Sequence, residues 1–292
     1  MPQRIAFLFQ TSRYQDPALA YLRAPGADLN ALADALRDPE LGAFDIVEVI
    51  ENQKVESLRW WIEELFGWRK RYDFLLLYVS GMTLSVEDGR HYLAAVDTRL
   101  EKLEETAIPA EFLAKWMDRS FSRRKVLVLD CFRQRPGPGG LLPDPLRVEK
   151  ALQSFTGEGK WRAILIAAGT AYRPALTPRS SFTETVIHGL QSGDADADQD
   201  GQINLQELHA YLSDRLSVKP ILWAHPQVEP FVVSVNPQKL RKPRTVKWDI
   251  LAGAVLAPLL TFFLGSWSDP VNAASFAAAI LLFYLGFYAV LE

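Results

Sequence analysis

The chain of 292 residues has little of what several protein classes require. It holds only four histidines and one cysteine, Cys131. A single cysteine excludes an internal disulfide and a metal site built from several thiolates. The net charge of -3 gives no overall electrostatic basis for binding nucleic acid. The first apolar run, Ile5 to Phe9, is too short for the core of a signal peptide, so we expect it to form a strand.

Long uncharged stretches stand near the carboxyl end instead. Residues 250–267 and 271–291 contain no charged side chain, and about 20 apolar residues suffice for a helix to cross a bilayer. Only three residues separate the two stretches, so the sequence predicts a tight hairpin of two transmembrane helices. Trp248 and Trp267 bracket the first helix as interfacial anchors. The alternative is a buried helical hairpin of a soluble protein.

The segment before the first predicted span is basic. Residues 237–249 form a predicted linker that carries Lys239, Arg241, Lys242, Arg244 and Lys247. Cytoplasmic flanks of membrane spans are enriched in lysine and arginine. The sequence therefore predicts a protein of the inner (plasma) membrane whose residues 1–236 face the cytoplasm. Two spans return the carboxyl terminus to the same side.

Apolar runs alternate with amphipathic runs along residues 1–236. This alternation predicts an α/β domain in which a mostly parallel sheet is covered by helices on both faces. The predicted strands are residues 4–9, 44–50, 74–79, 124–132 and 161–170, with a last edge strand at 229–235. The predicted helices are residues 28–38, 56–71, 110–119, 181–191 and 205–216. Residues 133–145 are rich in proline and glycine, which predicts a long loop.

Sites in such sheets lie at the carboxyl ends of the strands. The prediction therefore directs attention to Ser80–Thr83 after the third strand and to Asp130–Phe132 at the end of the fourth. We expect both stretches to lead into loops that carry reactive groups. Met82 is unexpected there, because a thioether has no acid–base chemistry.

The stretches TSRYQDPAL, DLNALADALRD, LLLYVSGM, HYLAAVDT, SRRKVLVLDCF and SFTETVIHGL occur in this order within residues 4–235. Together they resemble the caspase-like peptidases, in their bacterial metacaspase-type branch. The resemblance implies a caspase-like fold. It also implies cysteine endopeptidase ancestry and a role in bacterial stress, cell-death or phage-defence signalling.

The resemblance also locates a catalytic dyad. In that family a histidine follows the third strand and a cysteine ends the fourth. The thiolate attacks the peptide carbonyl, and the imidazole moves the proton. Here Met82 stands at the histidine position and Phe132 at the nucleophile position. Neither side chain can perform the step, which predicts a pseudopeptidase.

Two residues next to the missing nucleophile need separate interpretation. Side chains alternate across a strand, so Cys131 should face away from position 132 and act as a small buried apolar group. A dyad of Cys131 with a histidine, His91 being the nearest in sequence, is the alternative. By resemblance, Asp130 matches an acidic residue of the family's substrate pocket and could bind a basic side chain. Otherwise it accepts hydrogen bonds from nearby backbone N–H groups.

Residues 196–207, DADQDGQINLQE, fit the 12-residue calcium loop of an EF-hand. Gly201 stands at the turn, and the preceding helix is predicted to end near Gln191, so the unit would be a lone and irregular EF-hand. A solvated acidic loop that caps the next helix is the alternative. The predicted metal ligands are Asp196, Asp198, Asp200, Gln202, Asn204 and Glu207.

Three functions follow from these patterns. The first is a membrane-anchored pseudopeptidase that works as a binding module or membrane effector, through a protein partner or self-association. The second is an active membrane-bound cysteine endopeptidase that uses Cys131 and cleaves after basic residues. The third is a calcium-responsive interaction module.

Overall fold

A mostly parallel sheet organises residues 1–240. Its strands lie side by side in the order β10-β8-β6-β3-β1-β2. All neighbours are parallel except β10, which runs antiparallel to β8 at the edge. These strands are β1 (Arg4–Gln10), β2 (Ile46–Glu51), β3 (Phe74–Ser85), β6 (Arg124–Gly137), β8 (Arg162–Ile166) and β10 (Ile221–Ala224). The predicted α/β class with a mostly parallel sheet is confirmed.

The computed structural model describes residues 1–20, 29–137, 140–143, 148–167, 181–225 and 230–240. The chain divides into two compact units, Met1–Leu240 and Arg241–Glu292. The second unit lies outside the described residues, and so do both predicted membrane spans and most of the predicted linker. None of the helices in the described ranges has the length and apolar character that a membrane span requires.

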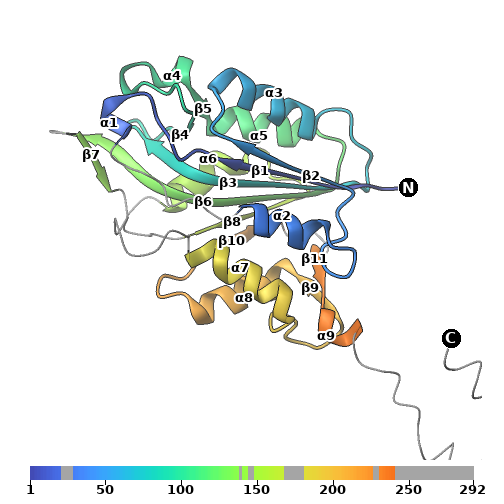
Figure 1. Cartoon of the computed structure of the whole chain (residues 1–292). Coiled ribbons are helices and arrows are strands. Elements are labelled where there is room, and N and C mark those ends of the chain that lie inside the picture. The colour runs from blue at the N-terminus through green and yellow to red at the C-terminus, as the bar shows by residue number, and fades with distance from the viewer. Residues whose placement is uncertain (21–28, 138–139, 144–147, 168–180, 226–229, 241–292) are drawn as a thin grey trace, which may run out of the picture. The chain divides into compact units, whose positions relative to one another are not determined.

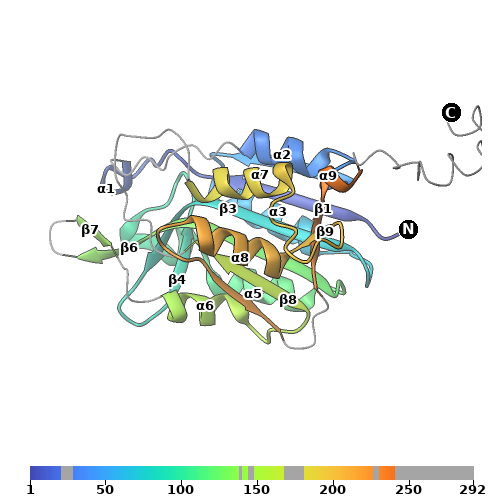
Figure 2. The ribbon, with the colours of Figure 1, turned by 90° about the horizontal axis from the view of Figure 1, so that it is seen from below.

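Helices cover both faces of the sheet (Figure 1). One face carries α3 (Val55–Phe66), α5 (Ala110–Arg119) and α6 (Val148–Thr156), and the other carries α2 (Leu29–Arg37), α7 (Ser181–Ser192) and α8 (Leu205–Arg215). Figure 2 shows α2, α7 and α8 together from below. Shorter helical segments are α1 (Pro17–Ala20), a 3₁₀ turn (Leu100–Lys102), α4 (Leu103–Thr106) and α9 (Pro237–Leu240).

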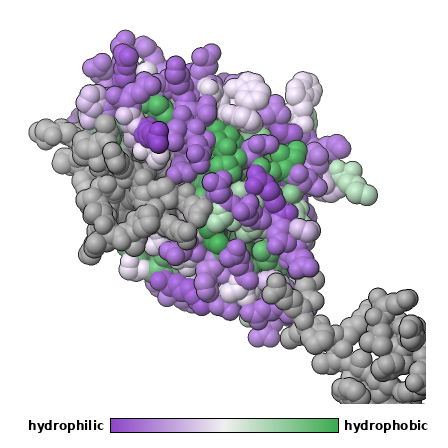
Figure 3. Space-filling model, viewed as in Figure 1, coloured by the Kyte–Doolittle hydropathy of each residue, from purple (hydrophilic) through white to green (hydrophobic). Residues whose placement is uncertain are grey.

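Alternating side chains of the strands build a separate core on each face. On β3, Leu75 and Leu77 pack with α3 and α5, whereas Leu76 and Tyr78 pack with α2 and α7. Strands buried on both faces need continuous apolar runs, which explains the sequence of β3. Figure 3 shows that, among the described residues, the face turned to the viewer in Figure 1 is mostly hydrophilic, with hydrophobic residues near its middle.

Two predicted strand ends are wrong. The sequence predicted loops from Ser80 and Arg133, but β3 continues to Ser85 and β6 to Gly137. The extension of β3 is stabilised by antiparallel pairing with β4 (His91–Ala94), which itself pairs with β5 (Ala107–Pro109). The extension of β6 pairs with β7 (Gly140–Pro143). The described residues of the predicted loop at 133–145, which are 133–137 and 140–143, therefore form two paired antiparallel strands.

The predicted edge strand at the end of the domain belongs elsewhere. β11 (Val232–Val235) pairs antiparallel with β9 (Gln202–Asn204) in a separate two-stranded sheet. The edge of the main sheet is β10, a four-residue strand that the sequence pattern did not reveal. A run this short carries too little periodicity to be recognised without its partner β8.

Candidate functional site

The register of β3 and β6 puts the two predicted dyad positions side by side. Met82 pairs with Phe132, and Gly81 pairs with Cys131, in a parallel ladder that runs from Phe74 to Leu84. Neighbouring strands lie about 4.8 Å apart. Residues from the third and fourth predicted strands thus meet at one point of the sheet, although 50 positions separate them in sequence. The side chain of Phe132 lies outside the described part.

Met82 is part of a small apolar core. Its side chain is 3% exposed and packs with Tyr14, Leu84 and Tyr92. The cavity beside it has a volume of only about 10 Å³, which is room for one water molecule at most. Among the described residues, the Met82 position is therefore filled by packed apolar side chains.

Position 81 on β3 has no room for a side chain unless the neighbouring residues shift. A Cβ atom at this position would lie 3.2 Å from the Thr11 carbonyl oxygen and 3.4 Å from the Tyr14 hydroxyl. The Tyr14 hydroxyl donates to the same Thr11 carbonyl at 2.9 Å. Burial raises the pKa of Tyr14, with a further contribution from the nearby Cys131 thiol.

Cys131 lies on the opposite face of β6 from Asp130. It packs in the core beneath α3 and α5 with Leu127 and Leu129, and its side chain is 6% exposed. Its Sγ lies 3.4 Å from the Val79 carbonyl oxygen. This burial gives the sulfur the surroundings of a small apolar side chain. His91 begins β4, is fully buried, and places Nδ1 3.1 Å from the Ser154 hydroxyl.

Asp130 faces α7. The Thr183 hydroxyl donates to its Oδ2 at 2.8 Å, and the Tyr78 hydroxyl lies 2.7 Å from the same Thr183 oxygen. Burial raises the pKa of Tyr78 well above its usual value, and the Asp130 charge adds to this effect. Asp130 is 5% exposed. Its side chain therefore interacts with a buried hydroxyl rather than with solvent.

The acidic loop brings three of its six predicted ligands together. Carboxylate oxygens of Asp196, Asp198 and Glu207 all lie within 4.8 Å of one another. Ligands on opposite sides of one Ca²⁺ are about 5 Å apart, because each Ca–O bond is about 2.3–2.6 Å long. The Asp200 carboxylate is not part of this group. The cluster could hold a metal ion.

One oxygen of this cluster has no hydrogen-bond partner. Asp196 is 6% exposed, and its Oδ1 is buried without a partner among the described residues. Its Oδ2 accepts from the Gly201 N–H at 3.1 Å and from the Asn236 side-chain amide at 2.8 Å. A buried carboxylate oxygen left unpaired costs free energy, which a bound cation would recover.

The remaining predicted ligands have local roles. Asp200 accepts from the Gln202 N–H at 2.7 Å. Asn204 is the N-cap of α8: its side chain accepts from the Glu207 N–H, and the Glu207 carboxylate accepts from the Asn204 N–H. Gly201 has a φ of 95°, a conformation that favours glycine at this turn. The predicted capping of the following helix is thus present alongside the acidic cluster.

Sequence analysis missed Asn236. It follows β11, is 8% exposed, and also donates its backbone N–H to the Gly201 carbonyl at 2.9 Å. β11 pairs antiparallel with β9, the strand inside the acidic loop. The loop is thus supported by a strand about 30 positions later in the chain, which spacing within the motif cannot reveal.

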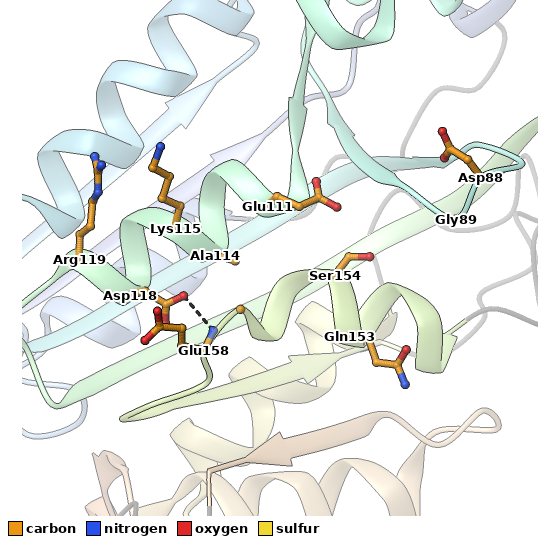
Figure 4. Close-up of a pocket in the computed structure, with 11 residues that line it drawn as sticks. Asp88, Gly89, Glu111, Ala114, Lys115, Asp118, Arg119, Gln153, Ser154 and Glu158 are labelled. Atoms are coloured by element: carbon orange, nitrogen blue, oxygen red, sulfur yellow. Dashed lines mark hydrogen bonds between the residues drawn. The ribbon is translucent and has the colours of Figure 1, made fainter.

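A larger pocket lies between α5, α6 and the β3–β4 turn (Figure 4). Its volume is about 810 Å³, and its walls carry both acids and bases, such as Glu111, Lys115 and Arg119. Asp118 accepts from the Glu158 N–H at 3.0 Å and pairs with the buried Arg162. The pocket includes none of the site residues that the sequence predicts.

No protein-family model and no curated protein matches the chain. Among solved structures, the chain is similar to pro-sf-caspase-1, with 16% identity and a TM-score of 0.48, covering 80% of this chain and 94% of that chain. It is also similar to a protein from Geobacter sulfurreducens, with 13% identity and a TM-score of 0.48, covering 78% of this chain and 95% of that chain. Values this low do not establish the family.

Proposed function

We propose that this chain is a catalytically inactive caspase-like protein. The observation that supports this most directly is the pairing of Met82 with Phe132. Two neighbouring positions that carry the dyad in the resembled family hold residues without acid–base or nucleophilic groups. The buried Cys131 lies on the other face of β6, so it is badly placed to replace the nucleophile.

A thiol-reactive peptide probe ending in arginine tests the inactive state. We expect no labelling of the folded full chain, and labelling of Cys131 only after denaturation. The Cys131→Ala variant is the matched control. Labelling of the native chain that this variant loses would mean that Cys131 is a working nucleophile, and the alternative of an active endopeptidase would replace our proposal.

We also propose that a hairpin of residues 250–267 and 271–291 holds the protein in the inner membrane, with residues 1–236 in the cytoplasm. Support comes from two uncharged stretches of suitable length that follow a basic segment. Alkaline extraction of membranes should leave the full chain in the pellet. Protease added to inverted vesicles should reach both termini. Release by alkali would contradict the anchor.

We further propose that the loop at 196–207 binds Ca²⁺ and makes the protein calcium-responsive. The unpartnered Asp196 Oδ1 beside Asp198 and Glu207 supports this. Calorimetry on the full chain in detergent should detect Ca²⁺ binding that Asp196→Ala abolishes. The absence of any binding heat in the native chain, together with an unchanged melting temperature, would contradict it. The protein partner or copy that responds would be sought afterwards by crosslinking.

A further inference from the structure

We propose that the amino-edge rim of the sheet docks on the surface of an anionic phospholipid bilayer. The amino-edge rim is the surface formed by residues 1–3, 67–73, 119–124 and 160–161, where the parallel strands begin. This inference rests on the proposed membrane anchor. It adds which side of residues 1–240 meets the lipid, which an anchor by itself does not determine.

Exposed apolar side chains gather on this rim. The described residues include six large apolar side chains that are exposed, and four belong to the rim: Met1, Trp68, Tyr72 and Phe121. Trp68 is 102% exposed and Phe121 is 79% exposed. Single exposed apolar residues are ordinary, but clusters indicate an interaction surface. Tryptophan and tyrosine are also the residues enriched at membrane interfaces.

Hydrogen bonds fix the two aromatic turns beside each other. The Arg123 N–H donates to the Arg71 carbonyl at 2.9 Å, and the Ser122 hydroxyl donates to the Asp73 carbonyl at 2.7 Å. The Arg123 guanidinium also stacks on the Trp161 ring, 4.4 Å from its centroid. Residues 67–73, 119–124 and 160–161 therefore present one continuous surface.

The outward charge of the rim is positive, although the whole chain is slightly acidic. Its exposed basic residues are Lys70, Arg71, Arg119, Arg124 and Lys160, of which Lys160 lies 4.0 Å from the Glu158 carboxylate just outside the rim. Asp73 is the one acidic residue within the rim, and it is 2% exposed. The Asp73 carboxylate accepts from the Gln3 and Lys70 N–H groups at 2.9 and 2.7 Å. Cations interspersed with aromatic rings suit the headgroup region of an anionic bilayer.

The chain also leaves the described domain near this edge. Arg4, which begins β1, donates to the carbonyl oxygens of Val232 and Val233 on β11. α9 follows directly, and Figures 1 and 2 both show it on the same side as the amino terminus. The described residues end at Leu240, and the basic segment and the two uncharged stretches come next in sequence. The described part of the chain therefore ends on the side of the rim.

Depth-dependent quenching tests the proposal on the full chain. In a Cys131→Ala background, one cysteine is introduced as Trp68→Cys, or as Val218→Cys for the control, and labelled with a polarity-sensitive fluorophore. Val218 is also exposed, at 45%. It lies at the opposite edge, because β10 begins at Ile221 opposite Ile166, the last residue of β8. The proteins are reconstituted in phosphatidylglycerol–phosphatidylcholine vesicles with brominated acyl chains.

We expect bromolipid to quench the label at position 68 and to leave the label at 218 bright. The quenching should fall at 1 M salt, where the screening length is about 3 Å. It should also be lost in pure phosphatidylcholine and in the double variant Lys70→Glu/Arg71→Glu. Lys219→Glu, at the opposite edge, is the charge control and should leave the quenching unchanged.

The contrary results are distinguishable. Chain that floats with the vesicles but shows equal quenching at 68 and 218 would overturn the docking of the rim and leave the anchor standing. Chain that does not float would contradict the anchor and this inference together. The third contrary result is a fluorescence of the label at position 68 that changes with the number of protein copies per vesicle and not with bromination of the lipid. That result would mean that a second copy covers the rim, and it would also overturn the proposal.

Discussion

Met82 and Asp196 are both almost fully buried, but their surroundings are opposite in character. Met82 packs with Tyr14, Leu84 and Tyr92 in an apolar core beside a cavity of about 10 Å³. Asp196 lies among other carboxylates and keeps one oxygen without a partner. Burial of an apolar side chain stabilises the folded state, whereas a buried carboxylate oxygen without a partner lowers the free energy of unfolding by about 1–3 kcal/mol.

Met82 thus belongs to a packed core, whereas Asp196 belongs to a group of carboxylates that could hold a metal ion. At position 82 on β3, the side chain packs in an apolar core. At residues 196–207, the fold holds three carboxylates close together, which repel one another unless a cation lies between them. The same domain therefore has a packed apolar position at Met82 and a group of carboxylates that could hold a metal ion.

Truncating Met82 should cause the largest change in stability. Met82→Ala should lower the free energy of unfolding by about 2–5 kcal/mol, because it opens a cavity in a packed core. Chemical denaturation of the full chain in detergent, followed by tryptophan fluorescence, would measure it. Val218→Ala, at an exposed position, should change the same quantity by less than about 0.5 kcal/mol. A similarly small cost for Met82→Ala would mean that the site is open rather than filled.

Calcium should stabilise the domain by a somewhat smaller amount. At a free Ca²⁺ concentration 100 times Kd, binding to the folded state adds about 2.7 kcal/mol. Glu207→Gln should remove this gain, because it removes one charge of the cluster while keeping an acceptor for the Ala197 and Asp198 N–H groups. Glu184→Gln, on α7, is the matched control and should keep it. Equal calcium stabilisation in both variants would place the ion elsewhere.

Loss of the supporting amide should have the smallest effect. Asn236→Ala removes the donor to Asp196 Oδ2, and changes of this kind lower metal affinity about 10–100-fold. Titration calorimetry would measure the affinity. Gln238→Ala is the control, because its amide reaches the Ser192 carbonyl instead of the carboxylate. Identical affinities for the two variants would show that β11 does not orient the loop.

Continuous apolar runs are typical of strands that are buried on both faces of a parallel sheet. The sequence therefore predicted the central residues of these strands. It also predicted α5 as residues 110–119, the bounds that the structure has, because Pro109 marks the start of the helical run. It failed where pairing decides the outcome. Ser80–Thr83 looks like a loop by composition, but hydrogen bonds to β4 and β6 keep it in strand.

The candidate sites were predictable to different extents. Fixed spacing was enough to find the carboxylates of residues 196–207, because their ligand atoms come from one short segment. Spacing could not reveal Asn236 or the β9–β11 pair, which depend on how a distant strand folds back. The resemblance already placed Met82 and Phe132 at the two positions of one dyad, but their direct pairing needed the sheet register, which a sequence pattern alone does not determine.

The most direct test of the central claim is the peptidase activity of the full chain in vesicles, measured with and without Ca²⁺ on fluorogenic peptides ending in lysine or arginine. Our account predicts no cleavage above the level of the Cys131→Ala variant, whether or not Ca²⁺ is bound. Cleavage by the native chain that Cys131→Ala abolishes would contradict it and make this protein an enzyme with a relocated nucleophile.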